Sequence, residues 1–175
     1  MQNLIVSIVN SQHFFMLESY LNNLSIDTKK RFGPHSFHIN GIQAFYASKP
    51  NKYGIIIIDA SSENYKIIGY AVLQKTVYLY DKQRIEQYGY TLNESDGSYA
   101  PSIADAWQGK GLGQLLWNKA VSIAEKENMQ RIFLWGGVQS DNLPARRYYE
   151  KNGFKWFGSF FHNGMNEDYY WQNNF

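Results

Sequence analysis

The amino-acid sequence predicts one domain of the α/β or α+β class, built around a mixed β-sheet. Short β-branched and aromatic segments alternate with segments whose apolar residues recur at helical spacing. No Pro/Gly-rich linker, repeat or low-complexity block divides the 175 residues. A hydrophobic content of 44% is high enough for a chain of this length to bury a substantial core.

Composition excludes several classes of protein and site. A net charge of +2 predicts no strong field for nucleic acid or for an anionic membrane. The chain has no cysteine, which rules out disulfides, thiolate metal sites and a cysteine nucleophile. Its four histidines show no metal-ligand spacing, so no metal site is expected. Without a signal-peptide pattern or an apolar run near ~20 residues, the chain is expected to be soluble and cytoplasmic.

The first half of the chain predicts helices mixed with strands. Leu4 to Val9 is a short apolar run typical of a strand, and Ser11 is expected to cap the helix that follows it. Ser25 to Phe32 predicts a second helix, and Asn40 is expected to cap a third. The clearest strands are Tyr53 to Asp59 and Lys66 to Gln74.

The second half alternates strands and helices, except that Val77 to Asp96 fits neither period. The expected elements are a strand at Tyr99 to Ala104, a helix at Leu112 to Ala124, a strand at Arg131 to Trp135, a helix at Leu143 to Lys151, and strands at Phe154 to Phe161 and Tyr169 to Trp171. The last two strands flank His162-Asn163-Gly164, which is a hairpin signal.

The strongest chemical signal is a glycine-rich segment between a strand and an amphipathic helix, Gln108-Gly109-Lys110-Gly111-Leu112-Gly113. Glycines allow a tight turn and let backbone N–H groups approach a ligand with no Cβ in the way. The free N–H groups of a helix's first turn then face one point, where the helix dipole favours negative charge. The segment predicts a pyrophosphate site, with an ordinary glycine-rich turn as the alternative.

The spacing of these glycines separates the segment from other phosphate-binding loops. A Walker A loop ends in Lys-Ser or Lys-Thr, and a Rossmann fingerprint needs G-x-G-x-x-G; neither is present. Gln108-x-x-Gly111-x-Gly113 instead resembles the acyl-CoA pyrophosphate loop of the GNAT superfamily of N-acyltransferases. The resemblance implies that backbone amides from Gly109 to Gln114, through Lys110, Gly111, Leu112 and Gly113, hold the CoA diphosphate, and that Gln108 also belongs to the cofactor site.

A second segment, Asn142 to Phe154 (NLPARRYYEKNGF), resembles the later GNAT motif of an Asn, a helix with an aromatic-Tyr pair, and Gly-Phe. Asn142 and Tyr149 are seven residues apart, or about two helical turns, so both side chains could face one ligand. The resemblance implies that Asn142 binds the pantetheine arm and that Tyr149 is the catalytic acid for the departing thiolate. Tyr148 is kept as the alternative acid. An ordinary N-cap and a core tyrosine are the competing interpretations.

The resemblance covers about Ile67 to Phe161 and implies a GNAT-like mixed, largely antiparallel sheet with helices on both faces. It also implies direct attack of an amine on the thioester in a ternary complex. The acetyl end would be lined by Pro101, Ser102 and Ile103, with a strand N–H near Ile103 polarising the carbonyl. Residues 1–175 would then be a single acyl-CoA N-acyltransferase domain that uses acetyl-CoA as co-substrate and no metal.

The proton acceptor is not assigned by the sequence. Many relatives carry a Glu where this chain has Ser98 and Gly137, so the chain departs from the family pattern there. The remaining candidates are Asp105, which equally fits a strand-end cap, together with Glu94, Asp96 and a water chain. A phenol near pKa 10 protonates a thiolate near 8.5 at a cost of about 2 kcal/mol. Tyr149 is therefore expected to help turnover without being indispensable.

The expected function is transfer of an acetyl group from acetyl-CoA to a primary amine. The alternative is a catalytically weak or inactive acyl-CoA-binding module of the same fold. Leu24 to Pro34 and Ala104 to Gly109 more weakly resemble bacterial protein-lysine acetyltransferase domains, so the acceptor is either a small-molecule amine or a protein lysine. Tyr78 to Tyr90 is interpreted as a wall of the acceptor site, an edge strand, or a homodimer contact. No nucleic-acid or membrane partner is expected.

Overall fold

The computed structural model describes residues 3–47, 51–61, 63 and 65–172. The strands are β1 (Leu4–Ile8), β2 (Lys52–Asp59), β3 (Lys66–Gln74), β4 (Asp96–Ile103), β5 (Arg131–Leu134), β6 (Val138–Gln139), β7 (Lys155–Phe161) and β8 (Met165–Gln172). The helices are α1 (Phe14–Asn22), α2 (Ile26–Arg31), α3 (Ile39–Ala47), α4 (Leu79–Gln87), α5 (Leu112–Lys126) and α6 (Leu143–Lys151). Short 3₁₀ turns occupy Ser11–His13 and Asp105–Trp107.

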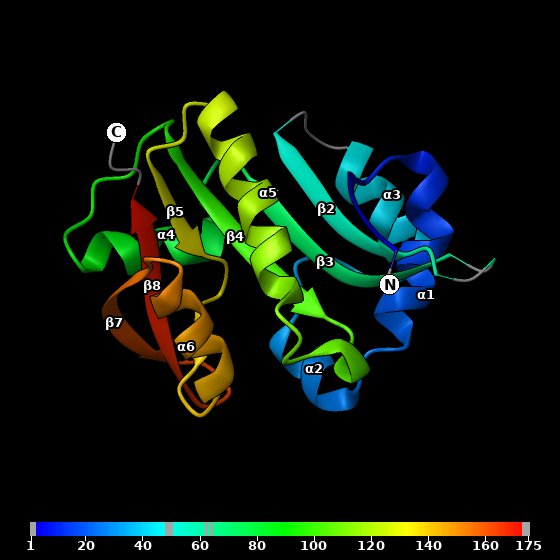
Figure 1. Ribbon diagram of the computed structural model, residues 1–175. Coiled ribbons are helices and arrows are strands. Elements are labelled where there is room, and N and C mark those ends of the chain that lie inside the picture. Colours follow the sequence, from blue (N-terminus) through cyan, green and yellow to red (C-terminus); the bar gives the residue numbers. More distant parts are fainter. Residues whose placement is uncertain (1–2, 48–50, 62, 64, 173–175) are drawn as a thin grey trace. The chain divides into compact units, whose positions relative to one another are not determined.

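The strands form a mixed sheet in the order β1-β2-β3-β4-β5-β8-β6, with β7 paired to β8 (Figure 1). The β4 and β5 strands run parallel, whereas β1 with β2, and β8 with each of β5, β6 and β7, run antiparallel. The mixed, largely antiparallel sheet expected from the sequence is therefore confirmed. No helix in the described part of the chain is both long enough and apolar enough to cross a bilayer.

Tertiary contacts divide the chain into two compact units. The first unit, residues 1–73 and 100–122, holds β1, nearly all of β3, β2, α1 to α3, the second half of β4 and most of α5. The second unit, residues 74–99 and 123–175, holds the first half of β4, α4, α6 and β5 to β8. That the chain acts as a single domain stays a prediction.

The first unit is built on strands that are buried on both faces. Ile55, Ile56 and Ile57 of β2 are all fully buried, which is why this strand is a continuous apolar run without alternation. Helices α1 and α3 contribute further buried side chains to this core, among them Leu17 and Ile42.

In the second unit, helices cover both faces of the sheet. Successive side chains of a strand point to opposite faces, so Asp168 and Tyr169 of β8 mark the two sides. Asp168 accepts a hydrogen bond from Arg84 of α4 at 2.6 Å, whereas Tyr169 donates one to Glu150 of α6 at 2.8 Å. Helices α4 and α6 therefore lie on opposite faces (Figure 1).

Two helix starts differ from the expected ones. Asn10, rather than Ser11, caps the first helical turn: its side chain accepts from the Gln12 N–H at 3.0 Å, and His13 Nδ1 accepts from the Asn10 N–H. Asn40 lies inside α3, which begins one residue earlier. The N–H of Ile39 donates to the Glu18 carboxylate of α1 at 2.8 Å, so a tertiary contact supplies the partner there.

Two further elements were not expected from the sequence. Residues 79–87, which fit neither period, form α4; its buried stripe contains only Asp81 and Ile85, four residues apart. A stripe this narrow, half of it charged, gives almost no apolar periodicity. The two-residue strand β6 exists because Val138 and Gln139 pair with β8, a contact distant in sequence.

Candidate active site

The glycine-rich segment forms an open turn that leads into α5. Gly109 and Gly111 have φ of +73° and +79°, a left-handed conformation that side chains with a Cβ rarely adopt. Among the described residues, the N–H groups of Gly109, Lys110, Gly111 and Leu112 make no hydrogen bond. Four neighbouring donors at a helix N-terminus are the requirement for binding a phosphate through backbone alone.

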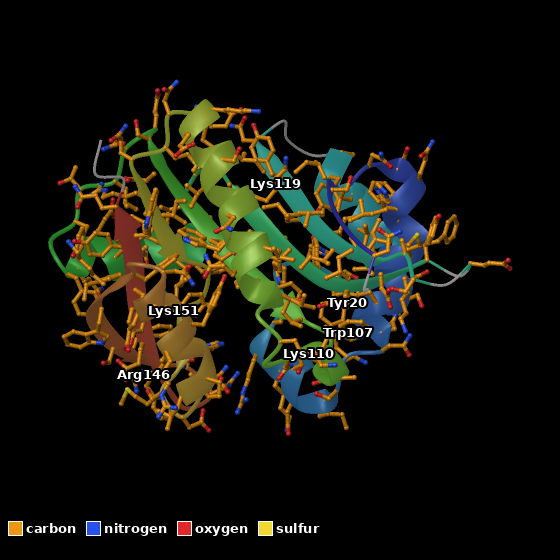
Figure 2. All side chains as sticks on the ribbon, viewed as in Figure 1. Tyr20, Trp107, Lys110, Lys119, Arg146 and Lys151 are labelled. Carbon is orange, nitrogen blue, oxygen red and sulfur yellow. The ribbon has the colours of Figure 1, made fainter. Side chains whose placement is uncertain are left out.

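One N–H group in the first turn of α5 is already used within the protein. The N–H of Gln114 already donates to the Gly111 carbonyl at 3.0 Å, and its side chain donates to Asn118. The Gln114 N–H is therefore less available to an anion than the N–H groups of residues 109–112, and the binding role of Gln114 stays a prediction. Lys110 is exposed, with its ammonium 4.8 Å from the centre of the Trp107 ring (Figure 2). The turn thus carries a cation beside its free N–H groups.

Gln108 connects the turn to the end of β4. Its side-chain amide donates to the carbonyl of Ile103 at 3.2 Å. The hydroxyl of Ser102 is buried, 2.9 Å from the Tyr20 hydroxyl, and it donates to the Tyr70 carbonyl. The Ser102 side chain is therefore already used within the protein. The binding roles of Pro101, Ser102 and Ile103 stay predictions.

Asn142 is the N-cap of α6. Its side-chain oxygen accepts from the Ala145 N–H at 3.4 Å, so the ordinary capping interpretation holds for this oxygen. In the described part of the chain, the side-chain NH₂ of Asn142 makes no hydrogen bond. The residue can cap the helix and donate to a ligand at the same time, because the two roles use different atoms.

Tyr149 has a buried ring and a hydroxyl without a partner. The ring contacts those of Tyr148, Phe154 and Tyr169, and 7% of the residue is exposed. Its hydroxyl makes no hydrogen bond to the described residues. No fully buried side-chain polar atom of the described residues lacks a partner, so the Tyr149 oxygen must reach the molecular surface. Tyr149 therefore has a ring held by its neighbours and a hydroxyl that is able to donate to a ligand.

Burial, and secondarily Tyr148, raise the pKa of Tyr149 well above its ordinary value. The phenol therefore stays protonated throughout the neutral range, and it is a weaker acid than a free tyrosine. Tyr148 differs: its hydroxyl lies 3.4 Å from that of Tyr99, and burial raises its pKa to about 12 although the contact with Tyr99 lowers it. Of these two hydroxyls, that of Tyr149 has no hydrogen-bond partner among the described residues, and its catalytic role stays a prediction.

The carboxylates proposed as bases are mostly occupied. Asp96 is buried and accepts from two nitrogens of the Arg131 guanidinium, at 2.7 and 2.8 Å. Glu94 is exposed. A Cβ at Gly137 would lie 2.8 Å from the Phe160 ring, so the position where relatives keep a carboxylate has no room for one. Among the described residues, no protein base is evident at the two family positions.

Asp105 has a structural role. Its two oxygens accept from the Ser25 N–H at 2.9 Å, the Ser25 hydroxyl at 2.7 Å and the Thr28 hydroxyl at 2.7 Å. Partial burial acts to raise the pKa of Asp105, but these hydrogen bonds lower it overall. The carboxylate therefore links the start of α2 to the segment that precedes the glycine-rich turn.

Asp105→Ala should lower stability without removing activity. A lost helix-start contact costs about 1 kcal/mol, less where water screens it. Because its pKa in the folded state is depressed, the contribution of Asp105 is present at neutral pH and is lost as pH falls below about 4. Thermal unfolding at pH 7 and pH 3 measures this. A hundredfold fall in turnover with an unchanged melting temperature would instead identify Asp105 as the base.

The first unit also contains a cavity of about 680 Å³ that the sequence did not indicate. Tyr20, Lys66 and Trp107 are among its lining residues, and they lie far apart in the sequence. In the described ranges, no three His, Cys, Asp or Glu side chains come together as a metal site would require. The ring of His35 is hydrogen-bonded to the Tyr70 hydroxyl at 2.7 Å.

Comparisons with known proteins identify the family and the fold. The model of the acetyltransferase (GNAT) family matches residues 17–154. A search of curated protein sequences gave no significant match. The chain is similar in fold to ribosomal-protein-S5-alanine acetyltransferase from Vibrio fischeri, with a TM-score of 0.73 and 14% identity over 99% of this chain and 95% of that one.

Two further structures show the same fold at low sequence identity. The GNAT domain of S. lividans PAT matches with a TM-score of 0.69 and 14% identity, over 96% of this chain and 89% of that one. A spermidine N-acetyltransferase SpeG chimera, from Vibrio cholerae and hSSAT, matches with a TM-score of 0.68 and 20% identity, over 97% of this chain and 95% of that one. Because the family model spans well over half of the sequence, this chain belongs to the GNAT acetyltransferase family.

Proposed function

We propose that this chain transfers an acetyl group from acetyl-CoA to a primary amine by direct attack in a ternary complex. The observation that carries the proposal is the set of four N–H groups, Gly109 to Leu112, at the N-terminus of α5 that have no partner among the described residues. Such donors suit a diphosphate and require no metal. Family membership makes the CoA diphosphate the natural occupant.

Each predicted residue has a defined task in this reaction. The N–H groups of the turn hold the diphosphate, and the NH₂ of Asn142 donates to the pantetheine arm. The amine lone pair attacks the thioester carbonyl, whose oxygen a strand N–H near Ile103 polarises. When the C–S bond breaks, the Tyr149 hydroxyl donates to the sulfur. Much of the rate enhancement comes from holding both substrates in line.

The proton released by the amine leaves through water in this proposal. Asp96 and Asp105 are committed to Arg131 and to the start of α2, and Ser98 and Gly137 provide no carboxylate. A water chain is therefore the acceptor that fits best. The expected cytoplasmic location belongs to the same proposal.

The second candidate is an acyl-CoA-binding module without turnover, and the occupied carboxylates favour it. Release of free thiol from acetyl-CoA, measured with a panel of primary amines, distinguishes the two functions. A transferase releases thiol only when an acceptor is present. A binding module is stabilised against heat by CoA but releases no thiol with any amine. Stabilisation by ATP or NAD in place of CoA would contradict both.

A further inference from the structure

Three aromatic side chains gather on the second unit around the start of α4. The ring of Tyr78 lies 4.6 Å from that of Trp135 and 5.3 Å from that of Tyr80, centre to centre. Tyr80 is 78% exposed, and Tyr78 and Trp135 are half-buried. We call Tyr78, Tyr80 and Trp135 the aromatic cluster. Its rings offer a surface with the negative face potential that attracts cations.

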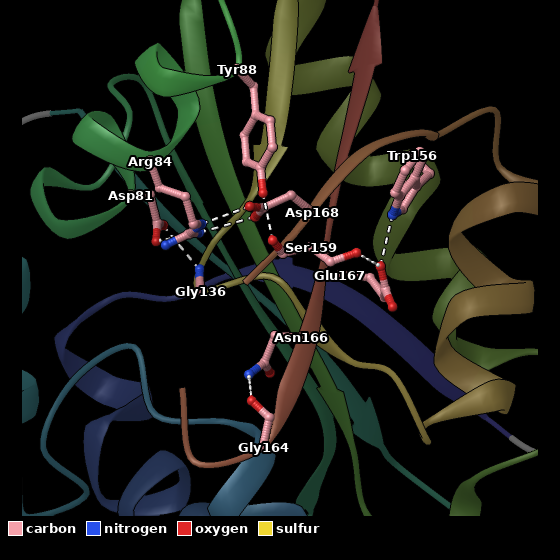
Figure 3. A network of polar contacts seen from close by, with 10 residues as sticks. All are labelled: Asp81, Arg84, Tyr88, Gly136, Trp156, Ser159, Gly164, Asn166, Glu167 and Asp168. Carbon is pink, nitrogen blue, oxygen red and sulfur yellow. Dashed lines mark hydrogen bonds and ion pairs between the residues drawn. The ribbon is translucent and has the colours of Figure 1, made fainter. Parts of the chain in front are cut away.

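Negative charge lies next to this cluster. Asp81 follows it directly, and Arg84 donates to Asp81 at 2.9 Å and to Asp168 at 2.6 and 3.0 Å (Figure 3). Two carboxylates share one guanidinium, so the group has a net charge of −1 while both acids are ionised. Both carboxylates are about 2% exposed, which limits screening by solvent.

The other charges near α4 do not cancel this one. Lys82 and Glu86 form their own exposed pair at 3.9 Å. After burial and Tyr80, Asp81 contributes to raising the pKa of Tyr78, because its charge reaches the phenol. The Asp81 carboxylate, next to Tyr80 in sequence and hydrogen-bonded to the N–H of Gly136 beside Trp135, therefore lies close to the aromatic cluster.

The cluster is hydrogen-bonded to one position where relatives carry a carboxylate, and Asp81 is hydrogen-bonded to the residue before the other. The N–H of Tyr78 donates to the Ser98 hydroxyl at 3.0 Å, and that hydroxyl donates in turn to the Thr76 carbonyl. The N–H of Gly136, next to Gly137, donates to Asp81 at 2.9 Å. The segment 76–81 thus borders the two sites from which the family carboxylate is missing.

From these contacts we infer that the aromatic cluster binds the acceptor as an alkylammonium ion. This inference rests on the proposed function and assigns the binding of its primary aliphatic amine, carried by a small molecule or by a lysine side chain, to named residues of the second unit. Asp81 acts as a positioning residue, since its fixed charge favours the cation without touching it. Each ring contact of this kind strengthens binding by a few-fold to about thirtyfold.

Choline, an unreactive ammonium, tests the cluster apart from acetyl transfer, and its uncharged isostere 3,3-dimethylbutanol measures apolar contact alone. We expect ligand-detected NMR titration to show choline binding at least fivefold more tightly than the isostere. Tyr78→Leu and Trp135→Leu should each remove that preference, whereas Phe161→Leu, which removes an exposed aromatic of the same unit, should keep it. Equal affinity for the two probes, or a preference that survives both leucine variants, overturns the inference.

Asp81→Asn tests the charge separately, because the amide keeps the shape and can still accept from Gly136. Choline affinity should fall several-fold while that of the isostere stays constant; an unchanged choline affinity overturns the role of Asp81. A shift from dimer in the wild-type chain to monomer in Tyr80→Leu would identify the cluster as a subunit contact and overturn the inference.

Rates of acetyl transfer to butylamine and to a lysine peptide then show whether the acceptor is a small-molecule amine or a lysine side chain. Tyr78→Leu should raise KM for the preferred acceptor about tenfold with less effect on kcat. Selective choline binding without any thiol release would leave the cation site standing and contradict the proposed function. Thiol release without selective choline binding would support the proposed function and overturn the cation site.

Discussion

Gly111→Glu should abolish acetyl-CoA binding. At φ +79° a Cβ strains the backbone, and the new carboxylate would stand among the free N–H groups where the diphosphate is expected. Losing two hydrogen bonds to a charged group, at about 1.5–3 kcal/mol each, weakens binding by about a hundredfold or more. Isothermal titration with CoA measures the effect directly.

Gly89→Glu is the matched control for this substitution. Gly89 follows α4 at φ +85°, and a Cβ at either Gly89 or Gly111 would have no atom within 4 Å of it. The two variants therefore share the backbone strain and the added charge, but only one changes the glycine-rich turn. If Gly111→Glu binds CoA as Gly89→Glu does, the diphosphate assignment is wrong.

Tyr149→Phe should lower kcat by up to about a hundredfold, the lower edge of what a general acid contributes, and should leave CoA affinity nearly unchanged. The hydroxyl has no partner among the described residues, so its removal costs little stability. Because burial raises its pKa, the wild-type enzyme should show no loss of activity from Tyr149 ionisation below about pH 10. Single-turnover thiol release from pH 6 to 10 measures both effects.

Tyr148→Phe serves as the control for the adjacent residue on the same helix. Its hydroxyl contacts that of Tyr99, so the variant loses an internal contact and should lose stability rather than turnover. Full activity in Tyr149→Phe would remove the acid role from that residue. Loss of activity confined to Tyr148→Phe would transfer the role to its neighbour.

The predicted site residues belong to different parts of the chain. Residues 101–114 lie in the first unit, whereas Asn142 and Tyr149 lie in the second. Each group is a short motif whose function depends on local backbone: two left-handed glycines before a helix, and an Asn that begins one. Local motifs of this kind are readable from sequence, because neighbouring residues set their geometry.

The helical segment around α4 could not be predicted from the sequence in the same way. The segment around α4 gave no clear period, because its buried stripe is Asp81 and Ile85 rather than a row of apolar residues. The burial of Asp81 is tolerated only because Arg84 and the Gly136 N–H pair with it. Arg84 is one helical turn from Asp81, but Gly136 is 55 residues away in the sequence. A local sequence pattern therefore cannot reveal the contact with Gly136.

The sequence by itself determined the mixed α/β fold, the ranges of most strands and helices, and the glycine-rich turn, because hydrophobic period and glycine conformation are local properties. The tertiary structure alone decided which polar groups are already used. It showed that Asp105 and Asp96 are tied to other residues, that Ser102 faces Tyr20, and that Tyr149 and the turn N–H groups are not occupied by the described residues. Hydrogen-bond partners distant in the chain meet only on folding, and whether a polar group has one decides whether it is left for a ligand.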